Sequence, residues 1–313
     1  MQTQRSFLDE MKHQYRSGGM HIRLIFINVL VFIVIGILIM VERLSSTKGV
    51  PGGIIKESLT DIFALSTNFA DLLYKPWGLI TSMFSHFDLA HCLLNMVFLF
   101  SAGRMFLQFF SGRRLLYTYI LAGLAGGLIE IVAHAIFPAF SQSSDVIVGA
   151  SGSIMGLFLA VVMYKPNMQV NLFGFIQMPF FILPLLFLIS DIVSLGSHDG
   201  VAHFAHLGGA FIGFLSVINL NSSSNLITRI EWLVDKIKVL LNRILKPKQK
   251  MRVERGGGNT SRSRTGKSDE QYNLDAKARQ EKIDGILDKI SKSGYESLSK
   301  AEKAFLFSQS NNG

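Results

Sequence analysis

One serine stands among glycines at the start of a strongly apolar segment, in the stretch VGASGSIMG that covers residues 148–156. Small residues on both sides of Ser151 let a helix begin sharply and let another backbone come close. Free N–H groups in the first turn, together with the helix dipole, favour negative charge there. These conditions suit a nucleophile whose reaction generates an oxyanion. Taken alone, the stretch equally fits a helix-packing motif with a capping serine.

A histidine that could serve as a base lies in a later apolar segment. His206, Gly209 and Gly213 recur at i, i+3 and i+7, which places them on one face of a helix. The two glycines let this helix approach a neighbour almost backbone to backbone, and Gly152 begins a matching small face in the serine segment. We expect this contact to bring the His206 imidazole within hydrogen-bond reach of the Ser151 hydroxyl, which needs a base to attack. A single histidine in such a segment also fits a structural hydrogen bond between helices.

Two further polar side chains could stabilise negative charge. His91 and Asn95 stand at i and i+4, so they share one helix face, and both can donate an N–H to an oxyanion. Cys92 is the only cysteine, so no disulfide forms within the chain. It points about 100° away from His91 on a helix and has no evident base, which disfavours a cysteine nucleophile.

Acidic residues and a metal site offer other interpretations of the same segments. Glu130 and Asp191 are interpreted as structural or network residues, because acids inside a membrane normally pair. His203 and His206 have the i, i+3 spacing of a ligand pair, but an HExxH pattern is absent from the sequence. The prediction is therefore that the protein needs no metal and no other cofactor.

The composition indicates a membrane protein. Of the 313 residues, 49% are hydrophobic and only 17% charged, and the mean hydropathy is +0.35, whereas soluble domains are more charged. The net charge of +9 is uneven, because the segment after Asn221 holds 19 of 31 basic and 11 of 22 acidic residues. A basic tail on a membrane protein favours the cytoplasmic face and anionic lipid headgroups as partners. Nucleic acid is not an expected partner.

Hydropathy predicts an all-α membrane protein with six spans. They cover about residues 22–41, 87–107, 115–137, 151–164, 172–195 and 201–220. The fourth span looks too short to cross the bilayer, so Ser151 is expected below the outer surface, in a water-filled pocket. Lys and Arg placement puts both termini on the cytoplasmic side.

The remaining segments complete the domain organisation. Residues 1–21 are a cytoplasmic segment, residues 22–220 the six-helix core, and residues 42–85 within it a long first loop in the membrane interface. Residues 221–246 have the apolar spacing of an amphipathic helix on the membrane surface. Residues 247–273 read as a flexible basic linker, and residues 274–313 as a small helical hairpin. Within the hairpin, Gly294 is expected to end the first helix and Ser299-x-x-Glu302 to cap the second.

The motifs on the second, fourth and sixth spans together resemble the rhomboid family of intramembrane serine proteases, in its bacterial type. The resemblance covers residues 22–220 and includes Trp77 and His86 ahead of the second span. It implies that Ser151 is the nucleophile and that His206 is the general base, a dyad without a required carboxylate. It also implies the roles of the remaining site residues: an oxyanion hole of His91, Asn95 and the Ser151 backbone N–H, with Gly149, Gly152, Gly209 and Gly213 in support.

One position departs from the family pattern. Gly78 follows Trp77 where many members have arginine, and this bears on how the first loop is anchored. The resemblance implies a multi-pass protein of the cell (inner) membrane that cleaves single-span transmembrane proteins within the bilayer near its outer face. The alternative is a catalytically inactive rhomboid-like module that binds transmembrane helices.

Overall fold

The computed structural model describes residues 7–45, 54–140, 146–172, 176–197, 199–245 and 269–310. The chain divides into two compact units, Met1–Pro247 and Lys248–Gly313, and each is described by itself. Most of the expected basic linker, residues 247–268, lies outside the described residues.

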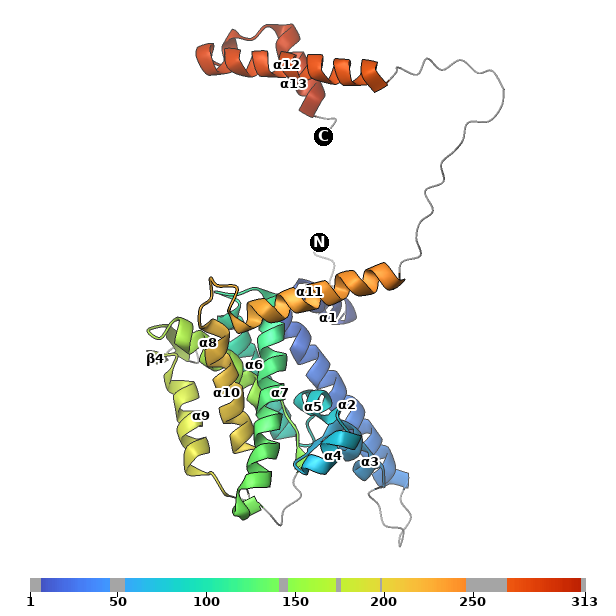
Figure 1. Cartoon of the computed structure of the whole chain (residues 1–313), viewed down its shortest axis with the longest axis vertical. Helices are drawn as coiled ribbons and strands as arrows, with labels where there is room; N and C mark the ends of the chain where they lie inside the picture. The colour runs from blue at the N-terminus through green and yellow to red at the C-terminus, as the bar shows by residue number, and fades with distance from the viewer. Residues whose placement is uncertain are drawn as a thin grey trace, which may run out of the picture. The chain divides into compact units, whose positions relative to one another are not determined.

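The first unit is a bundle of helices (Figure 1), and its described residues also form two short antiparallel strand pairs. Its elements are α1 (Phe7–Ser17), α2 (Met20–Ser45), α3 (Ile54–Phe63), β1 (Leu65–Ser66), α4 (Phe69–Tyr74), α5 (Gly78–Thr81), η1 (Ser82–Phe84), α6 (Leu89–Phe106), α7 (Gly112–Ile136), η2 (Pro138–Phe140), β2 (Val146–Ile147), α8 (Ser151–Tyr164), β3 (Gln169–Leu172), β4 (Ile176–Pro179), α9 (Ile182–Val193), α10 (His203–Val217) and α11 (Leu226–Leu245).

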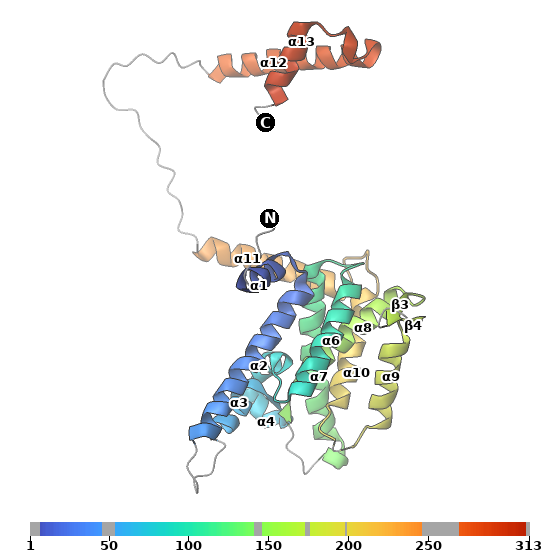
Figure 2. The same ribbon diagram turned by 180° about the vertical axis from the view of Figure 1, so that it is seen from behind.

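Helix α8 is the centre of this bundle. Most of its side chains are buried, among them Leu157, Phe158 and Val161. Helices α6, α7 and α10 pack around it, while α2 and α9 lie on opposite sides of the unit (Figures 1 and 2). A helix that is apolar on all faces belongs inside a bundle, and this one carries the candidate nucleophile at its first residue.

Small residues hold α7, α8 and α10 together. A Cβ added at Gly209 would collide with the Gly152 carbonyl oxygen, and one at Gly213 with the carbonyl oxygen of Gly156. On the other side, a Cβ at Gly126 of α7 would lie 2.5 Å from the carbonyl oxygen at residue 205 of α10. These helices therefore touch backbone to backbone, as the glycine spacing predicts.

The first loop is built from short helices that pack beside α7. Glu42 caps α3, since its carboxylate accepts the N–H groups of Ile55 at 2.7 Å and Lys56 at 3.2 Å. Strand β1 pairs antiparallel with β2, which ties the loop to the segment just before α8. A Cβ at Gly78 would lie 2.9 Å from the Ala64 carbonyl oxygen. The glycine at this position thus makes room for the backbone that leads into β1.

Among the residues that the structure describes, three helices have the length and hydropathy to cross a membrane, namely α2, α6 and α7. Helices α8, α9 and α10 are apolar but shorter, with 14, 12 and 15 residues. The expected fifth span, residues 172–195, is wrong in its first half. That half contributes to the antiparallel hairpin of β3 and β4, and α9 begins only at Ile182. Hydropathy alone does not separate a short strand from a helix, and Pro179 stands at the break.

Helix α11 crosses the end of the bundle away from α3 and α4 (Figures 1 and 2). Arg113 at the start of α7 forms an ion pair with Asp235 at 2.7 Å and donates to the Glu231 carbonyl oxygen at 3.0 Å. Arg114 donates to the Ser216 carbonyl oxygen at 2.9 Å, near the end of α10. These two arginines attach α11 and the end of α10 to α7.

The second unit contains α12 (Asp269–Ser293), η3 (Tyr295–Ser297) and α13 (Lys300–Ser310). Gly294 has φ of 74°, the left-handed conformation that ends a helix. Before α13, the Ser299 N–H donates to the Glu302 carboxylate at 2.7 Å, and the Glu302 N–H donates to the Ser299 hydroxyl at 3.3 Å. These bonds, with Lys289, lower the pKa of Glu302 to about 2. The capping box predicted from Ser299-x-x-Glu302 is present.

Candidate active site

Ser151 is the first residue of α8 and follows a constrained turn. Gly149 has φ of 117°, a conformation that residues with a side chain rarely adopt. Its N–H donates to the Ser82 carbonyl oxygen at 2.9 Å, which fixes the turn against η1. The chain then enters the helix through Ala150, which is fully buried. Glycine is required at position 149, so the turn that presents Ser151 depends on it.

The His206 imidazole meets the serine from α10. Its Nε2 lies 2.8 Å from the Ser151 Oγ. The backbone contacts of Gly209 and Gly213 with α8 set this distance, because larger residues would separate the two helices. At this separation the imidazole can accept the hydroxyl proton when Nε2 carries no proton of its own.

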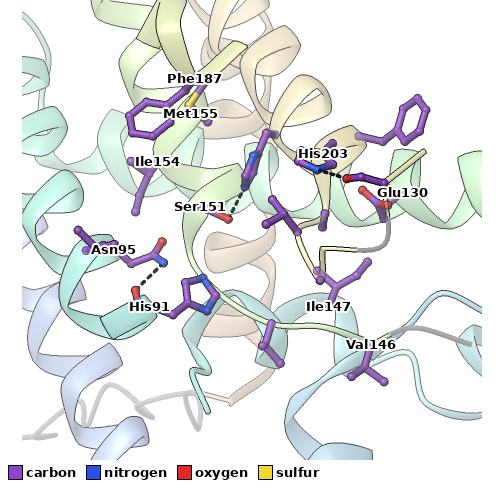
Figure 3. Close-up of a pocket in the computed structure, with 18 of the residues that line it drawn as sticks. His91, Asn95, Glu130, Val146, Ile147, Ser151, Ile154, Met155, Phe187 and His203 are labelled. Carbon is purple, nitrogen blue, oxygen red and sulfur yellow. Dashed lines mark hydrogen bonds between the residues drawn. The ribbon is translucent and has the colours of Figure 1, made fainter. Parts of the chain in front are cut away.

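His91 and Asn95 face the same space from α6 (Figure 3). Asp88 caps this helix by accepting the His91 N–H at 2.8 Å. The Asn95 Nδ2 donates one hydrogen to the His91 carbonyl oxygen at 2.9 Å, which leaves its second amide hydrogen available. A Cβ at Gly149 would lie 2.8 Å from the His91 Nε2, so the glycine also makes room for this ring.

His86 supports His91 from the turn before α6. Its ring is fully buried, and its centroid lies 5.2 Å from that of His91, edge to face. Burial, together with the proximity of His91, lowers the pKa of His86 to about 4. His86 is therefore neutral at physiological pH and packs against the candidate oxyanion donor without adding charge.

These side chains line one cavity of about 690 Å³. Figure 3 shows Ser151, His91 and Asn95 around it, with Met155 and Phe187 on the apolar side. The cavity has room for several residues of an extended peptide, and Ser151, His91 and Asn95 supply part of its polar lining. Most of its lining is apolar.

Asp191 of α9 contacts the candidate base. Its Oδ1 lies 2.8 Å from the His206 Nδ1 and 2.9 Å from the His203 Nδ1. The other nitrogen of His203 lies 3.2 Å from both carboxylate oxygens of Asp199. The Val201 N–H, which donates to Asp199 at 3.0 Å, lowers the pKa of that carboxyl group, and Ser197 and His203 lower it further.

The sequence interpretation of Asp191 as a network residue missed its contact with His206. The available signal was a lone acid in an apolar segment, but sequence spacing does not show which face of α9 meets α10. Glu130 of α7 was interpreted in the same way. Its carboxylate accepts the Ala205 N–H at 2.8 Å, and so caps the first turn of the helix that carries His206.

The metal alternative has one geometric point in its favour. Single ligand atoms of Asp191, His203 and His206 all lie within 4.8 Å of one another. In the described residues, however, both nitrogens of His206 already have hydrogen-bond partners, Ser151 and Asp191. The observed contacts account for each imidazole nitrogen in this group without an ion.

The comparisons with known proteins give one family for the helical bundle and a second family for the C-terminal segment. Residues 74–222 match the family model of the Rhomboid domain, and residues 267–312 match a family of unknown function, DUF6576. RHOMBOID-like protein 12, mitochondrial, of Arabidopsis thaliana is 28% identical over 149 residues, which are 44% of this chain and 44% of that protein. RHOMBOID-like protein 6, mitochondrial, of the same plant is 30% identical over 140 residues, 45% of this chain and 42% of that protein. The aligned region thus spans less than half the length of these relatives.

Proposed function

Because the chain is a member of the rhomboid family, we propose that it is an intramembrane serine endopeptidase. Its substrates are single-span transmembrane proteins, which it cleaves within the bilayer near the outer face. The observation that carries the proposal is the distance of 2.8 Å between the Ser151 Oγ and the His206 Nε2, which both line a cavity of about 690 Å³.

The residues around the cavity supply each step of an acyl transfer. The Ser151 oxygen attacks the substrate carbonyl carbon while its proton passes to the His206 Nε2. His91, Asn95 and the Ser151 backbone N–H stabilise the oxyanion. His206 then gives the proton to the departing amine, which leaves an ester on Ser151, and water releases the second product with His206 again as base.

The proposed membrane arrangement keeps six spans, three of them short. Helix α8 has 14 residues, about 21 Å of helix against a hydrocarbon core of about 30 Å. With its end at Lys165 on the cytoplasmic side, Ser151 lies below the outer surface. Backbone groups at that depth need water or protein partners, and the polar groups that line the cavity are proposed to keep water there.

The proposed orientation places both termini in the cytoplasm. Arg104, Arg113, Arg114 and Lys165 all fall at one end of the helices. Helix α11 lies at this end and exposes Trp232, Leu233, Ile237 and Leu240, so it is proposed to lie on an anionic lipid surface. The cell (inner) membrane and the bacterial type stay predictions, because two of the relatives are named as mitochondrial plant proteins.

Cleavage of a transmembrane reporter by the purified protein tests the proposal. Ser151→Ala and His206→Ala are each expected to abolish cleavage, while both variants keep the thermal unfolding temperature of the wild type in detergent. Cleavage that persists in either folded variant would refute the assignment. An inactive wild type that still binds the reporter helix would instead support the non-catalytic module.

A further inference from the structure

Asp191 is the one charged residue of α9, whose sequence is ILPLLFLISDIV. Its side chain is 6% exposed. A buried carboxylate is costly unless hydrogen bonds compensate the lost hydration. In this protein the compensation comes from the imidazoles of His203 and His206, both on α10, which donate to the same oxygen, Oδ1.

The contact with His206 decides which of its nitrogens carries the proton. A neutral imidazole has one N–H and one bare nitrogen. A carboxylate oxygen only accepts, so the Nδ1 that faces Asp191 at 2.8 Å must be the protonated nitrogen. The Nε2 that faces Ser151 at 2.8 Å is then bare, which is the form able to take the serine proton.

His203 holds this carboxylate from the other side. Its Nδ1 lies 2.9 Å from Asp191, and its Nε2 lies 3.2 Å from Asp199 and 3.4 Å from the Ser197 Oγ. The Nδ1–H donates to Asp191, and the contacts of Nε2 with Asp199 and Ser197 hold the other side of the ring. The Asp191 oxygen is thereby held in one position between two imidazoles.

We propose that Asp191 is a positioning residue that fixes the tautomer and orientation of His206, with His203 holding its carboxylate, so that Ser151, His206 and Asp191 work as a triad. The inference rests on the proposed serine chemistry. During attack the serine proton moves to the His206 Nε2, the Nδ1 proton stays on the ring, and Asp191 stays ionised beside the new imidazolium. The carboxylate takes up no proton at any step.

Asp191→Asn in the full-length protein is the primary test, because the amide has the same shape and lacks the charge. In a Ser–His–Asp triad the same replacement lowers kcat by about 10⁴-fold, and we expect a fall in kcat of about 10²–10⁴-fold with KM nearly unchanged. Ser190→Ala is the matched control, because Ser190 is exposed on the same helix and is expected to keep wild-type kinetics. Asp199 contacts His203 but not His206. Asp199→Asn is therefore expected to lower kcat less than Asp191→Asn does.

Nitrogen NMR of isotopically labelled histidine adds a readout that a purely structural role would not change. The wild type is expected to show His206 protonated at Nδ1, and Asp191→Asn to show a mixture of tautomers. A wild-type ring protonated at Nε2 would overturn the proposal even if the variant failed to fold. Cleavage within about twofold of wild type by folded Asp191→Asn would overturn it as well.

Two outcomes separate this inference from its alternatives. A wild type that cleaves no reporter would refute the proposed function, whereas the tautomer measurement would still test the contact of Asp191 with His206. One zinc ion per chain in the purified wild type, lost in Asp191→Asn, would show a metal site in place of the triad and would overturn the inference.

Discussion

At the scale of single residues, the nucleophile and base are held by backbone features and the oxyanion donors by side-chain hydrogen bonds. Ser151 stands at a helix start that needs Gly149 in its left-handed conformation. Asn95 is 4% exposed, and its amide bonds to the His91 carbonyl oxygen. A donor fixed in this way needs no reorganisation when negative charge develops beside it.

Asn95→Ala is therefore expected to lower kcat by about 10²–10³-fold, the usual effect of removing one oxyanion donor. KM should change little, because the donor acts mainly in the transition state. Steady-state cleavage of the reporter measures both constants. Asn171→Ala, at an exposed position in β3, is the control. If Asn95→Ala raised KM and left kcat intact, Asn95 would bind substrate and not the oxyanion.

The sequence predicts the contact between the serine and its base, but it does not predict the contacts of the residues around them. Glycines at fixed helical spacing leave few ways for two helices to touch, so the meeting of Ser151 and His206 could be predicted. Asp191 could not be assigned, because its contact depends on the rotation of α9 about its own axis. That rotation follows from packing between helices that are far apart in the sequence.

At the scale of helices, the contact between α8 and α10 carries the site. An alanine at Gly209 would push its methyl group into the Gly152 backbone, and neither helix can yield without moving Ser151 or His206. We expect Gly209→Ala to destabilise the protein by about 1–3 kcal/mol and to lower cleavage strongly.

Gly36→Ala provides the matched control for this glycine. Gly36 lies within α2, and an added Cβ would meet no heavy atom within 4 Å. Alanine there is expected to be neutral or to stabilise the helix by up to about 1 kcal/mol. Thermal unfolding in detergent compares the two variants. Equal unfolding temperatures would mean that the helix contact tolerates a side chain.

Hydropathy located the helices better than it located their ends. The prediction for α8, residues 151–164, matches the structure, because Gly149 and Pro166 bound the segment clearly. The expected fifth span included the end of β3 and all of β4, because the sequence of residues 172–181, LFGFIQMPFF, is largely apolar. Helices α9 and α10 are shorter than a full membrane span, and their sequences do not indicate how deeply they lie in the membrane.

At the scale of the whole molecule, basic residues are concentrated in the part of the sequence that follows Asn221. The segment after Asn221 carries most of the net charge of +9, and α11 within it presents exposed apolar side chains beside basic ones. A fragment that begins after Leu220 is expected to bind vesicles rich in anionic lipid at low salt.

Salt and lipid composition separate the two contributions to this binding. Raising the ionic strength to 1 M shortens the screening length to about 3 Å and should release most of the fragment. Co-sedimentation with anionic and neutral vesicles measures the effect. Equal binding to both kinds of vesicle would mean that the fragment attaches only through the apolar face of α11. No binding to anionic vesicles at low salt would refute the proposal that this segment binds anionic lipid.

The central claim is that Ser151 is a nucleophile activated by His206. Labelling of the purified wild type with a fluorophosphonate, followed by mass spectrometry of the modified peptide, tests it most directly. The account predicts modification at Ser151 in the wild type and loss of that modification in folded His206→Ala. Modification at another residue, or an unchanged labelling rate at Ser151 without the imidazole, would contradict it.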